Sequence, residues 1–491
     1  MHWTTHILPM KLSITKTLLA LAALLVAGPV ATLAQQSEID QLKATMKAMQ
    51  QTMDEMKAKI EQLEKQKPAP TVPPPVAPPT GGVQVVTFTP AATEIVGHAS
   101  PVQPRHALND QQDAAPRPND QTLDPQYRGY IPVPNTPALI KFNAKPRLDM
   151  TSDSQNSGNP DRFVTAQIPT GPPASGGGEQ FNLNARGSQL GVDVRAPDMA
   201  GNFRFVYQND FFGSGGGMAY RLKQLYGEFY NVTAGFTYSI FEDPDVWPDT
   251  VDFEGPNSAI FARQPTLRYA LPLNDQWQVD FGVQQPSSDI DGGPAGSRFN
   301  GATANNQAPD GGFNVRWEDA DLGHVQFATI LRDLGARDPG VTRDQNAFGW
   351  GLNLSSSLKV LQYDSVQGQV TYGEGIFHFC NDNFSNNDAA YDHSGDLKAL
   401  PYFAVMAGYT HRWSDAFRST ATFGLVNLDD EPSQGPDAYH RTYYGSCNVV
   451  WQLRKHLSVG LEGLYGRKEV QSGASGDVFR VQLGLVYSLF D

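Results

Sequence analysis

Two absences narrow the possibilities at once: the sequence has almost no cysteine and, beyond its N-terminus, no long apolar run. Cys380 and Cys447 are the only cysteines in 491 residues, which excludes a fold held by several disulfides. Export, argued below, would allow the two to pair, whereas their places on different predicted strands argue against it. The sequence leaves that question open. Without further apolar runs of about 20 residues, a bundle of membrane-spanning helices is excluded.

Basic charge and catalytic motifs are also lacking. The 37 Lys and Arg residues are outnumbered by 51 Asp and Glu, for a net charge of -14, so we expect no nucleic-acid partner. There is no Gly-x-Ser-x-Gly elbow, no His-Glu-x-x-His motif and no phosphate-binding loop. His378 and His393 lie near Cys380 but lack a second pair of ligands at zinc spacing. The Asp- and Asn-rich stretch 379–396 fits a solvated loop better than a calcium site. We therefore expect no enzymatic activity, no metal and no cofactor.

The first 34 residues have the three parts of a secretory signal peptide. Lys11 and Lys16 precede the apolar run 18–27, and the small residues Ala31-Thr-Leu-Ala34 form a cleavage site. An uncleaved anchor helix is the alternative, but the apolar run is short for a membrane span. We predict that residues 1–34 are removed after export.

Residues 36–67 carry the heptad pattern of a coiled coil. Apolar residues recur at alternating spacings of three and four, at Ile39, Leu42, Met46, Met49, Met53, Met56, Ile60 and Leu63. The alternative is one amphipathic helix packed on its own domain. The narrow apolar seam favours self-association, without fixing the number of helices. Pro68 ends the pattern, and residues 68–137 are predicted to be a Pro-rich, mostly irregular linker.

Residues 138–491 are predicted to form an all-β transmembrane barrel of antiparallel strands. In the last segment, residues 478–490, Phe479 and every second residue after it are apolar, and most of the others are polar or small. Such alternation gives a strand one apolar and one polar face. We predict about sixteen strands, at 139–150, 180–195, 202–211, 219–230, 232–241, 258–271, 275–285, 311–319, 322–332, 345–360, 365–379, 400–412, 416–428, 440–453, 456–468 and 476–490.

The connections between these segments alternate in length, which favours a membrane barrel over a soluble sandwich. Tight turns separate long loops, which we place at 151–179, 242–257, 286–310, 333–344, 380–399 and 429–439. Outer-membrane barrels have short periplasmic turns and long outer loops. Aromatic residues near strand ends fit the girdles of such barrels: Tyr226, Tyr230, Tyr402, Tyr409, Trp413, Tyr443, Trp451 and Tyr487.

A barrel of this size leaves an aqueous channel, whose selectivity depends on what narrows it. We predict that loop 242–257 folds into the barrel and carries the acidic side of a constriction, with Glu242, Asp243, Asp245, Trp247, Asp249, Asp252 and Glu254. The basic side would come from neighbouring strands, with Arg147, Arg186, Arg204, Arg221, Lys223, Arg263 and Arg268. Opposed charges set up a transverse field, and arginines hold carboxylates bidentately. The alternative is that these arginines pair with acids of the wall and only fix strand register.

The loop residues Phe241–Asn257, with the following Arg263-Gln-Pro265 and Arg268-Tyr269, resemble the DcaP-like outer-membrane porins. The order of signal peptide, heptad helix, Pro-rich linker and barrel is also similar. The resemblance covers nearly the whole chain, and the loop motif is its most specific part. It implies a trimer of 16-stranded barrels with periplasmic coiled-coil extensions, an inward-folded loop 242–257, and passage of small anions such as dicarboxylates.

We therefore expect an outer-membrane porin of a Gram-negative bacterium, through which small hydrophilic solutes, preferably organic anions, diffuse passively. Its barrel would contact outer-membrane lipid, and its coiled coil would lie in the periplasm. One alternative is a structural tether, in which a closed barrel anchors the coiled coil to the membrane. Another is a barrel-type outer-membrane enzyme, which needs a Ser-His pair that the sequence does not place. A soluble secreted β-protein is the weakest alternative.

Overall fold

The computed structural model describes residues 127–489, apart from 128, 172–177, 198, 339–343, 362 and 385–386. The described residues belong to one compact unit, residues 95–491. The predicted signal peptide 1–34, the coiled coil 36–67 and most of the linker 68–137 lie outside the described residues. No helix in the described part of the chain is long and apolar enough to cross a membrane.

The described residues form mostly antiparallel strands, with β11 and β17 paired in parallel, and the 3₁₀ helices η2, η3 and η4. The longer strands are β2 (Leu139–Lys145), β3 (Arg147–Asp153), β4 (Gln180–Asn184), β5 (Gln189–Ala196), β6 (Phe203–Asp210), β7 (Arg221–Phe229), β8 (Val232–Tyr238), β9 (Arg263–Pro272), β10 (Trp277–Gln284), β13 (Asp310–Asp319), β14 (Gly323–Arg337), β15 (Asp344–Val360), β16 (Asp364–Glu374), β19 (Pro401–Arg412), β20 (Phe417–Leu428), β21 (Tyr439–Arg454), β22 (Leu457–Val470) and β23 (Ser475–Tyr487). The short elements are β1 (Ile131–Pro132), β11 (Ile290–Asp291), β12 (Thr303–Ala304), β17 (Ala389–Tyr391), β18 (Leu397–Ala399), η2 (Thr165–Gln167), η3 (Pro244–Val246) and η4 (Phe377–Phe379).

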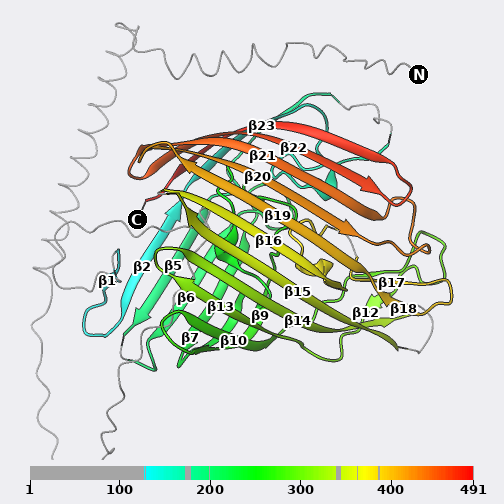
Figure 1. Cartoon of the computed structure of the whole chain (residues 1–491), viewed down its shortest axis with the longest axis horizontal. Helices are drawn as coiled ribbons and strands as arrows, with labels where there is room; N and C mark the ends of the chain where they lie inside the picture. Colours follow the sequence, from blue (N-terminus) through cyan, green and yellow to red (C-terminus); the bar gives the residue numbers. More distant parts are fainter. Residues whose placement is uncertain are drawn as a thin grey trace, which may run out of the picture. The chain divides into compact units, whose positions relative to one another are not determined.

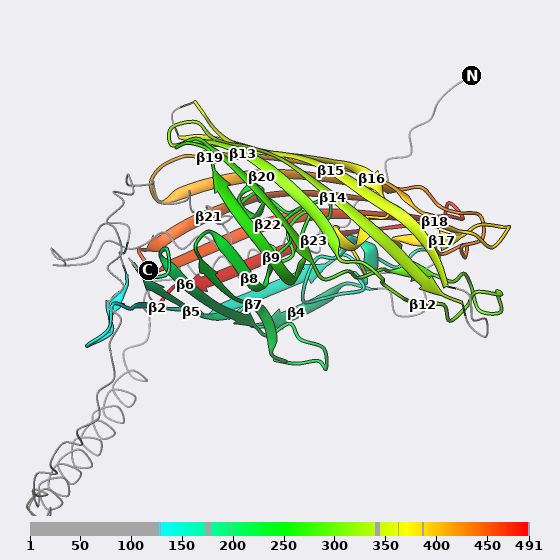
Figure 2. The same ribbon diagram turned by 90° about the horizontal axis from the view of Figure 1, so that it is seen from below.

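Each longer strand pairs with the one before and the one after it along the wall. Figure 1 shows β14, β15, β16 and β19–β23 side by side in this order, and Figure 2 shows β5, β6 and β7 along another side. β2 and β3 follow each other along one interrupted wall strand, and β4 and β5 along the next; these two wall strands pair through β2 with β5 and through β3 with β4. The last strand, β23, pairs with β3, so the series of pairings returns to its beginning. We call this series the ring and the space inside it the lumen.

The strand count differs from the sixteen predicted, for two physical reasons. Five short strands, β1, β11, β12, β17 and β18, lie outside the predicted segments, and β1 falls within the predicted linker. Two predicted strands are each split. Pro146 has no backbone N–H to donate and separates β2 from β3, while residues 185–188 separate β4 from β5 where the alternation of polarity changes phase. The part of the chain that the structure describes therefore has 23 strands.

Three predicted boundaries are wrong at one end of the ring. Within the predicted loop 333–344, all but one of the described residues are strand, because β14 runs to Arg337 and β15 begins at Asp344. The predicted strands 258–271 and 365–379 are too long, since β9 begins only at Arg263 and β16 ends at Glu374. We call this end, which carries most of the long connections, the loop end, and the other the turn end. The predicted alternation of short turns and long loops holds for most of the ring. The exceptions are the connections 338–343 and 471–474, which are short although they lie at the loop end.

The polarity of the ring is the reverse of that of a soluble protein. On β15, Leu354 is 51% exposed, whereas its neighbours Asn353 and Ser355 are buried. The same alternation places Gln367, Gln369 and Thr371 of β16 inside and its Val366, Val370 and Tyr372 outside. Two of the residues expected in aromatic girdles, Tyr226 and Tyr402, are buried because they fall on the inward parity of their strands; Tyr230, Tyr409, Trp413, Trp451 and Tyr487 are exposed.

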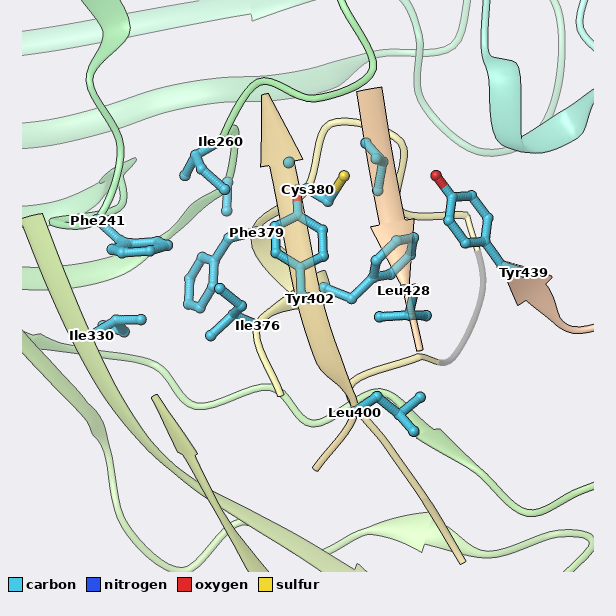
Figure 3. Packing of buried hydrophobic residues seen from close by; sticks show 14 of the residues in the cluster. Phe241, Ile260, Ile330, Ile376, Phe379, Cys380, Leu400, Tyr402, Leu428 and Tyr439 are labelled. Atoms are coloured by element: carbon cyan, nitrogen blue, oxygen red, sulfur yellow. The ribbon is translucent and has the colours of Figure 1, made fainter. Parts of the chain in front are cut away.

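Long loops fill part of the lumen near the loop end with an apolar cluster. Phe241 and Phe379 come from two different loops, and their rings meet edge to face with centroids 5.6 Å apart (Figure 3). They pack against inward residues of the wall, including Ile330 on β14 and Tyr402 on β19 (Figure 3). The apolar residues of 376–379 thus belong to this cluster, which explains why their pattern was mistaken for a continuation of β16.

Both cysteines are unpaired. Cys380 is buried in the apolar cluster and Cys447 is exposed on β21. Burial raises the pKa of the Cys380 thiol to about 12, so this thiol stays protonated at neutral pH.

Candidate functional site

Loop 242–257 lies inside the ring and is held from several sides. Its prolines, Pro244, Pro248 and Pro256, prevent it from continuing strand β8. Asp243 accepts a hydrogen bond from the backbone N–H of Asp245 and so caps the short helix η3. Nearly all of the loop is buried, although it carries six acidic side chains. Buried acids require partners, and the wall of the lumen supplies them.

The first anchor joins the start of the loop to strands β13–β15. The Asp243 carboxylate lies 3.2 Å from the Arg316 guanidinium and 2.8 Å from His324 Nε2, and it accepts a 2.6 Å hydrogen bond from the Ser355 hydroxyl. Arg316 also reaches Asp245 at 2.7 Å. Burial opposes ionisation of Asp243, but His324 and Arg316 outweigh it and hold the pKa of Asp243 below its usual value.

Burial prevails at the second acid of this anchor. It raises the pKa of Asp245 to about 7, because Arg316 is shared with Asp243 and only partly compensates for the loss of water. Below neutral pH, therefore, Asp243 carries the negative charge of this anchor and Asp245 is mainly neutral.

The second anchor joins the middle of the loop to β3 and β20–β23. Asp249 is paired with Arg418 on β20, and its carbonyl oxygen accepts a 2.7 Å hydrogen bond from Asn448. The Asp252 N–H donates to Glu462 at 2.6 Å. The carbonyl oxygen of Val251 accepts hydrogen bonds from Arg147 and Gln482. Burial raises the pKa of Asp252 to about 7, against the opposing field of Arg480.

Inward-facing glycines leave room for the loop against the wall. A Cβ atom at Gly408 would lie 2.7 Å from Pro248 Cγ, and one at Gly484 would lie 2.7 Å from Val251 Cγ1. Real Cβ contacts are longer, so any side chain at these positions would displace the loop. Contact with the loop thus explains why the inward face of the last strand has a small residue at position 484.

A narrow cavity of about 50 Å³ lies between the loop and the wall at the loop end, and we call it the outer cavity. Its charged lining is mainly basic, with Arg162, Arg221, Lys223 and Arg263 facing Glu242 and Glu254. Aromatic rings complete it, from Tyr238, Trp247, Phe253 and Phe261. Such an arrangement can hold a small anion while the rings exclude water from part of the cavity.

The seven basic residues predicted for the constriction divide into two groups. Three of them, Arg221, Lys223 and Arg263, line the outer cavity together. The other four do not line it. Five of the seven are in ion pairs with carboxylates of the wall or a loop: Arg147 with Asp149, Arg186 with Asp161, Arg204 with Asp193, Arg221 with Asp210, and Arg268 with Asp280.

Lys223 and Arg263 are in contact with aromatic rings. The Lys223 ammonium lies 5.6 Å from the centre of the Phe253 ring, and the Arg263 guanidinium lies 4.4 Å from that of Phe261. Arg263 is on the outward parity of β9, but it stands at the first residue of the strand, where the chain turns in from the loop. Its Nε atom is buried and has no hydrogen-bond partner among the described residues.

The acidic residues of the loop mostly face away from these basic residues. Asp243 and Asp245 point to Arg316 on β13, and Asp249 points to Arg418 on β20. Neither arginine is among the basic residues predicted from the sequence. Trp247 packs edge to face on Phe261, with ring centroids 5.0 Å apart. Only Glu242 and Glu254 share the outer cavity with the basic group, and Glu254 is paired with Arg162 at 2.8 Å.

Residues that the sequence analysis missed could partly have been found by parity. Arg316, Arg418 and Glu462 lie on the inward parity of β13, β20 and β22, opposite apolar outward residues. Arg162 carries no such signal, because it lies in the irregular loop 154–179 and reaches the outer cavity only through tertiary folding.

One group of possible metal ligands lies in the described part of the chain. Oxygen or nitrogen atoms of Asp289, His378 and Asp388 lie within 4.8 Å of one another. The buried guanidinium of Arg332 is 3.0 Å from Asp388 and 3.1 Å from Asp310. Arg332 therefore already supplies the positive charge that these carboxylates require, and the arrangement is that of a structural ion-pair network.

A ring of antiparallel strands, apolar outside and polar inside, with a loop narrowing its lumen, defines the architecture of an outer-membrane channel. Comparison with known proteins agrees. The chain belongs to the DcaP outer membrane protein family, whose model matches residues 127–489. The protein is accordingly one of the outer membrane.

Among solved structures, the chain is similar to the outer membrane channel DcaP of Acinetobacter baumannii, with a TM-score of 0.64 and 18% identity, over 73% of this chain and 99% of that one. It is less similar to Salmonella typhi OmpF in complex with daunomycin, with a TM-score of 0.47 and 10% identity over 73% and 99% of the two chains. For Pseudomonas putida OprB the TM-score is 0.43 and the identity 9%, over 71% and 94%. A search of curated proteins found no match.

Proposed function

We propose that the protein is a diffusion porin that passes small hydrophilic solutes and prefers small organic anions, dicarboxylates among them. The ring acts as a closed transmembrane barrel of sixteen wall strands, with β2–β3 and β4–β5 each counted once. Solutes move down their gradient, and loop 242–257 sets the narrowest part of their path.

The observation that carries this proposal is the composition of the outer cavity. Four basic residues line it against two acids; Arg162 is paired with Glu254 and Arg221 with Asp210, which leaves Lys223 and Arg263 against Glu242. The remaining acids of the loop are turned toward Arg316, His324 and Arg418 or hydrogen-bonded to backbone groups, so their charge is largely compensated. A solute entering the outer cavity therefore meets a net positive field in a partly dry space, where charge interactions are stronger than in water.

The arrangement in the membrane follows from the same architecture. The outward apolar residues contact outer-membrane lipid, and the turn end faces the periplasm, as in other barrels with short periplasmic turns. The predicted heptads of residues 36–67 and the family resemblance support a homotrimer, with the coiled coil in the periplasm of a Gram-negative bacterium.

Ion selectivity in a planar bilayer tests this proposal. Under a tenfold KCl gradient we expect a reversal potential of the sign given by chloride preference. The double variant K223Q/R263Q removes two charges from the outer cavity and should move the reversal potential toward that of a nonselective pore. The shift reflects a loss of about half of the cationic lining.

A matched variant separates this effect from a general loss of charge. R204Q/R268Q also removes two arginines on the inward parity of the wall, but these are paired with Asp193 and Asp280 and lie outside the outer cavity. It should change selectivity less than K223Q/R263Q does. A channel that prefers cations, or one whose selectivity is the same in wild type and K223Q/R263Q, would contradict the proposed anion preference.

A further inference from the structure

A second, larger cavity lies on the turn side of loop 242–257. Its volume is about 460 Å³, and we call it the turn-side cavity. The loop forms its inner boundary with Asp249, Thr250 and Val251. The rest of its lining comes from the ends of β2, β3 and β19–β23, from the start of β5 with Gly187 before it, and from the turns 412–418 and 455–458. The loop thus separates it from the outer cavity.

The charged lining of the turn-side cavity is also basic. It contains Lys145, Arg147, Arg412, Arg418, Lys455 and His456, against the acids Asp249 and Asp415. Arg418 is paired with Asp249, and Arg147 with Asp149. Within the described residues, no carboxylate forms an ion pair with Arg412 or Lys455. The positive charge of this cavity is therefore only partly balanced by the protein.

Two of these arginines face each other across neighbouring strands. Arg412 of β19 and Arg418 of β20 are directly opposite in the strand register, and both are on the inward parity. Like charges directly opposite on a sheet repel and destabilise the pair. Asp249 compensates Arg418, whereas Arg412 and Lys455 have no ion-pair partner among the described residues. A bound anion would relieve that repulsion.

The two cavities lie on either side of one aromatic ring. Phe253 lines the outer cavity, and the Lys223 ammonium lies 5.6 Å from the centre of its ring. The Arg147 guanidinium, which lines the turn-side cavity, lies 5.3 Å from the same ring centre. Gln189 lines both cavities. Phe253 and Gln189 therefore place the two basic cavities next to each other.

From this geometry we infer that the turn-side cavity is a second anion-binding site, which holds small dianions in series with the outer cavity. The inference rests on the proposed porin function for its role in transport, but the site itself is defined by its lining. A dianion suits it because positive groups approach from several strands at once. Exposure of Arg412 and Lys455 at the mouth keeps the binding weak, so the ion is released to the turn end.

Inorganic phosphate is the probe for this site. Phosphate is added to one side of a single channel in chloride solution and then to the other, and the reduction of current is measured. R412Q/K455Q should raise the half-blocking phosphate concentration about tenfold on the side where phosphate acts, because two unit charges near a dianion are lost. The control R454Q/K359Q removes two positive charges at the turn end that do not line the cavity. Its half-blocking phosphate concentration should equal that of wild type.

A binding measurement without current separates failure of this inference from failure of the porin proposal. Phosphate should raise the thermal unfolding midpoint of the detergent-solubilised protein, and R412Q/K455Q should lose most of that rise while the control keeps it. If wild type conducts but phosphate acts equally on R412Q/K455Q, the second site is refuted and the porin stands. If wild type does not conduct but the phosphate-dependent rise is lost in R412Q/K455Q, the site stands and the transport role is refuted.

Discussion

The acids of loop 242–257 act mainly as anchors to the wall. Asp243, Asp245 and Asp249 are all turned to basic residues on strands far along the chain, Arg316 on β13 and Arg418 on β20. A guanidinium beside a buried carboxylate compensates its charge, so these acids contribute little to the field that a passing ion experiences. The acidic composition of the loop thus serves its attachment, and selectivity depends on the residues left uncompensated.

The raised pKa values of two loop acids predict how the attachment depends on pH. In a loop detached into water, an aspartate has a pKa of about 3.9. In the attached loop, burial raises the pKa of Asp245 and of Asp252 to about 7. The contribution of these two acids to attachment is therefore greatest below pH 4 and weakens as pH rises from about 4 to 7, where the detached acids lose their protons and the attached ones keep theirs. The pKa of Asp243 is lowered in the attached loop, so protonation of this acid weakens the attachment, and it does so only below about pH 4.

We expect the noise of the open-channel current to increase between pH 5 and pH 8 in wild type. The double variant D245N/D252N should remove most of this increase, since its amides do not titrate. D245N alone should leave the contribution of Asp252. Noise that rises equally in wild type and in the double variant would assign the pH dependence to other groups.

At the scale of the element, the inward glycines determine how closely the loop packs. A valine at Gly408 would place its Cβ 2.7 Å from Pro248 Cγ, with two further methyl groups beyond it. Overpacking of this kind costs about 1–3 kcal/mol, enough to displace the loop from the wall in a large fraction of molecules. We expect G408V to fold but to show higher conductance and more noise than wild type.

Gly445, on the next strand but one, provides the control. It lies on the outward parity of β21, and a Cβ built there meets nothing within 4 Å. G445V should conduct like wild type. Equal behaviour of the two variants would show that loop packing against Gly408 does not set conductance.

Strand periodicity could be predicted from the sequence because it depends on local alternation. The last strand illustrates this, since Leu483 and Leu485 face outward while Gln482 and Gly484 face the lumen. The strand boundaries were predicted wrongly where apolar residues pack inside the lumen and do not face outward. Ile376 and Phe379 continue an apolar pattern after β16, but they pack in the lumen on Phe241 and Tyr402, which no local rule reveals. The end of β14 was missed for the same reason, because Leu334 and Ala336 pack on Ile290 and Tyr391 from other loops.

The candidate site could be predicted only in part. The loop and the basic strands beside it were recognisable from composition, and Arg221, Lys223 and Arg263 do line one cavity. The pairing of Asp243 with Arg316, or of Asp249 with Arg418, joins residues more than 70 positions apart. Which acid meets which base is determined by how the loop crosses the lumen, and the sequence contains no local signal for that.

At the scale of the whole molecule, a buried ion pair joins the first and last wall strands, where the ring closes. Arg480 on β23 is fully buried and lies 2.6 and 2.8 Å from the two carboxylate oxygens of Asp153 on β3, 327 positions away. It also donates to Ser157 and to the carbonyl oxygen of Asn159. The junction between the first and last strands is thus fixed by charge as well as by backbone hydrogen bonds.

We expect D153N to weaken this junction markedly. The substitution leaves a buried guanidinium without its counter-charge, which typically costs about 3–5 kcal/mol. The heat-modifiable gel shift of the folded protein should occur at a clearly lower temperature. E469Q removes an acid from the more exposed pair with Arg467 and should have little effect. Equal shifts for the two variants would mean that Asp153 and Arg480 do not stabilise the junction.

The central claim is that loop 242–257 crosses the lumen and separates two basic cavities, and a cross-link tests it most directly. A Cβ built at Gly460 lies 3.5 Å from Val251 Cβ, within the range of disulfides. In a C447S background, V251C/G460C should form a disulfide nearly completely, with conductance unchanged when the bond is reduced. V251C/G445C, with the second cysteine on the outward face, should not form one. A V251C/G460C protein that stays reduced, or one whose conductance rises on reduction, would contradict the account.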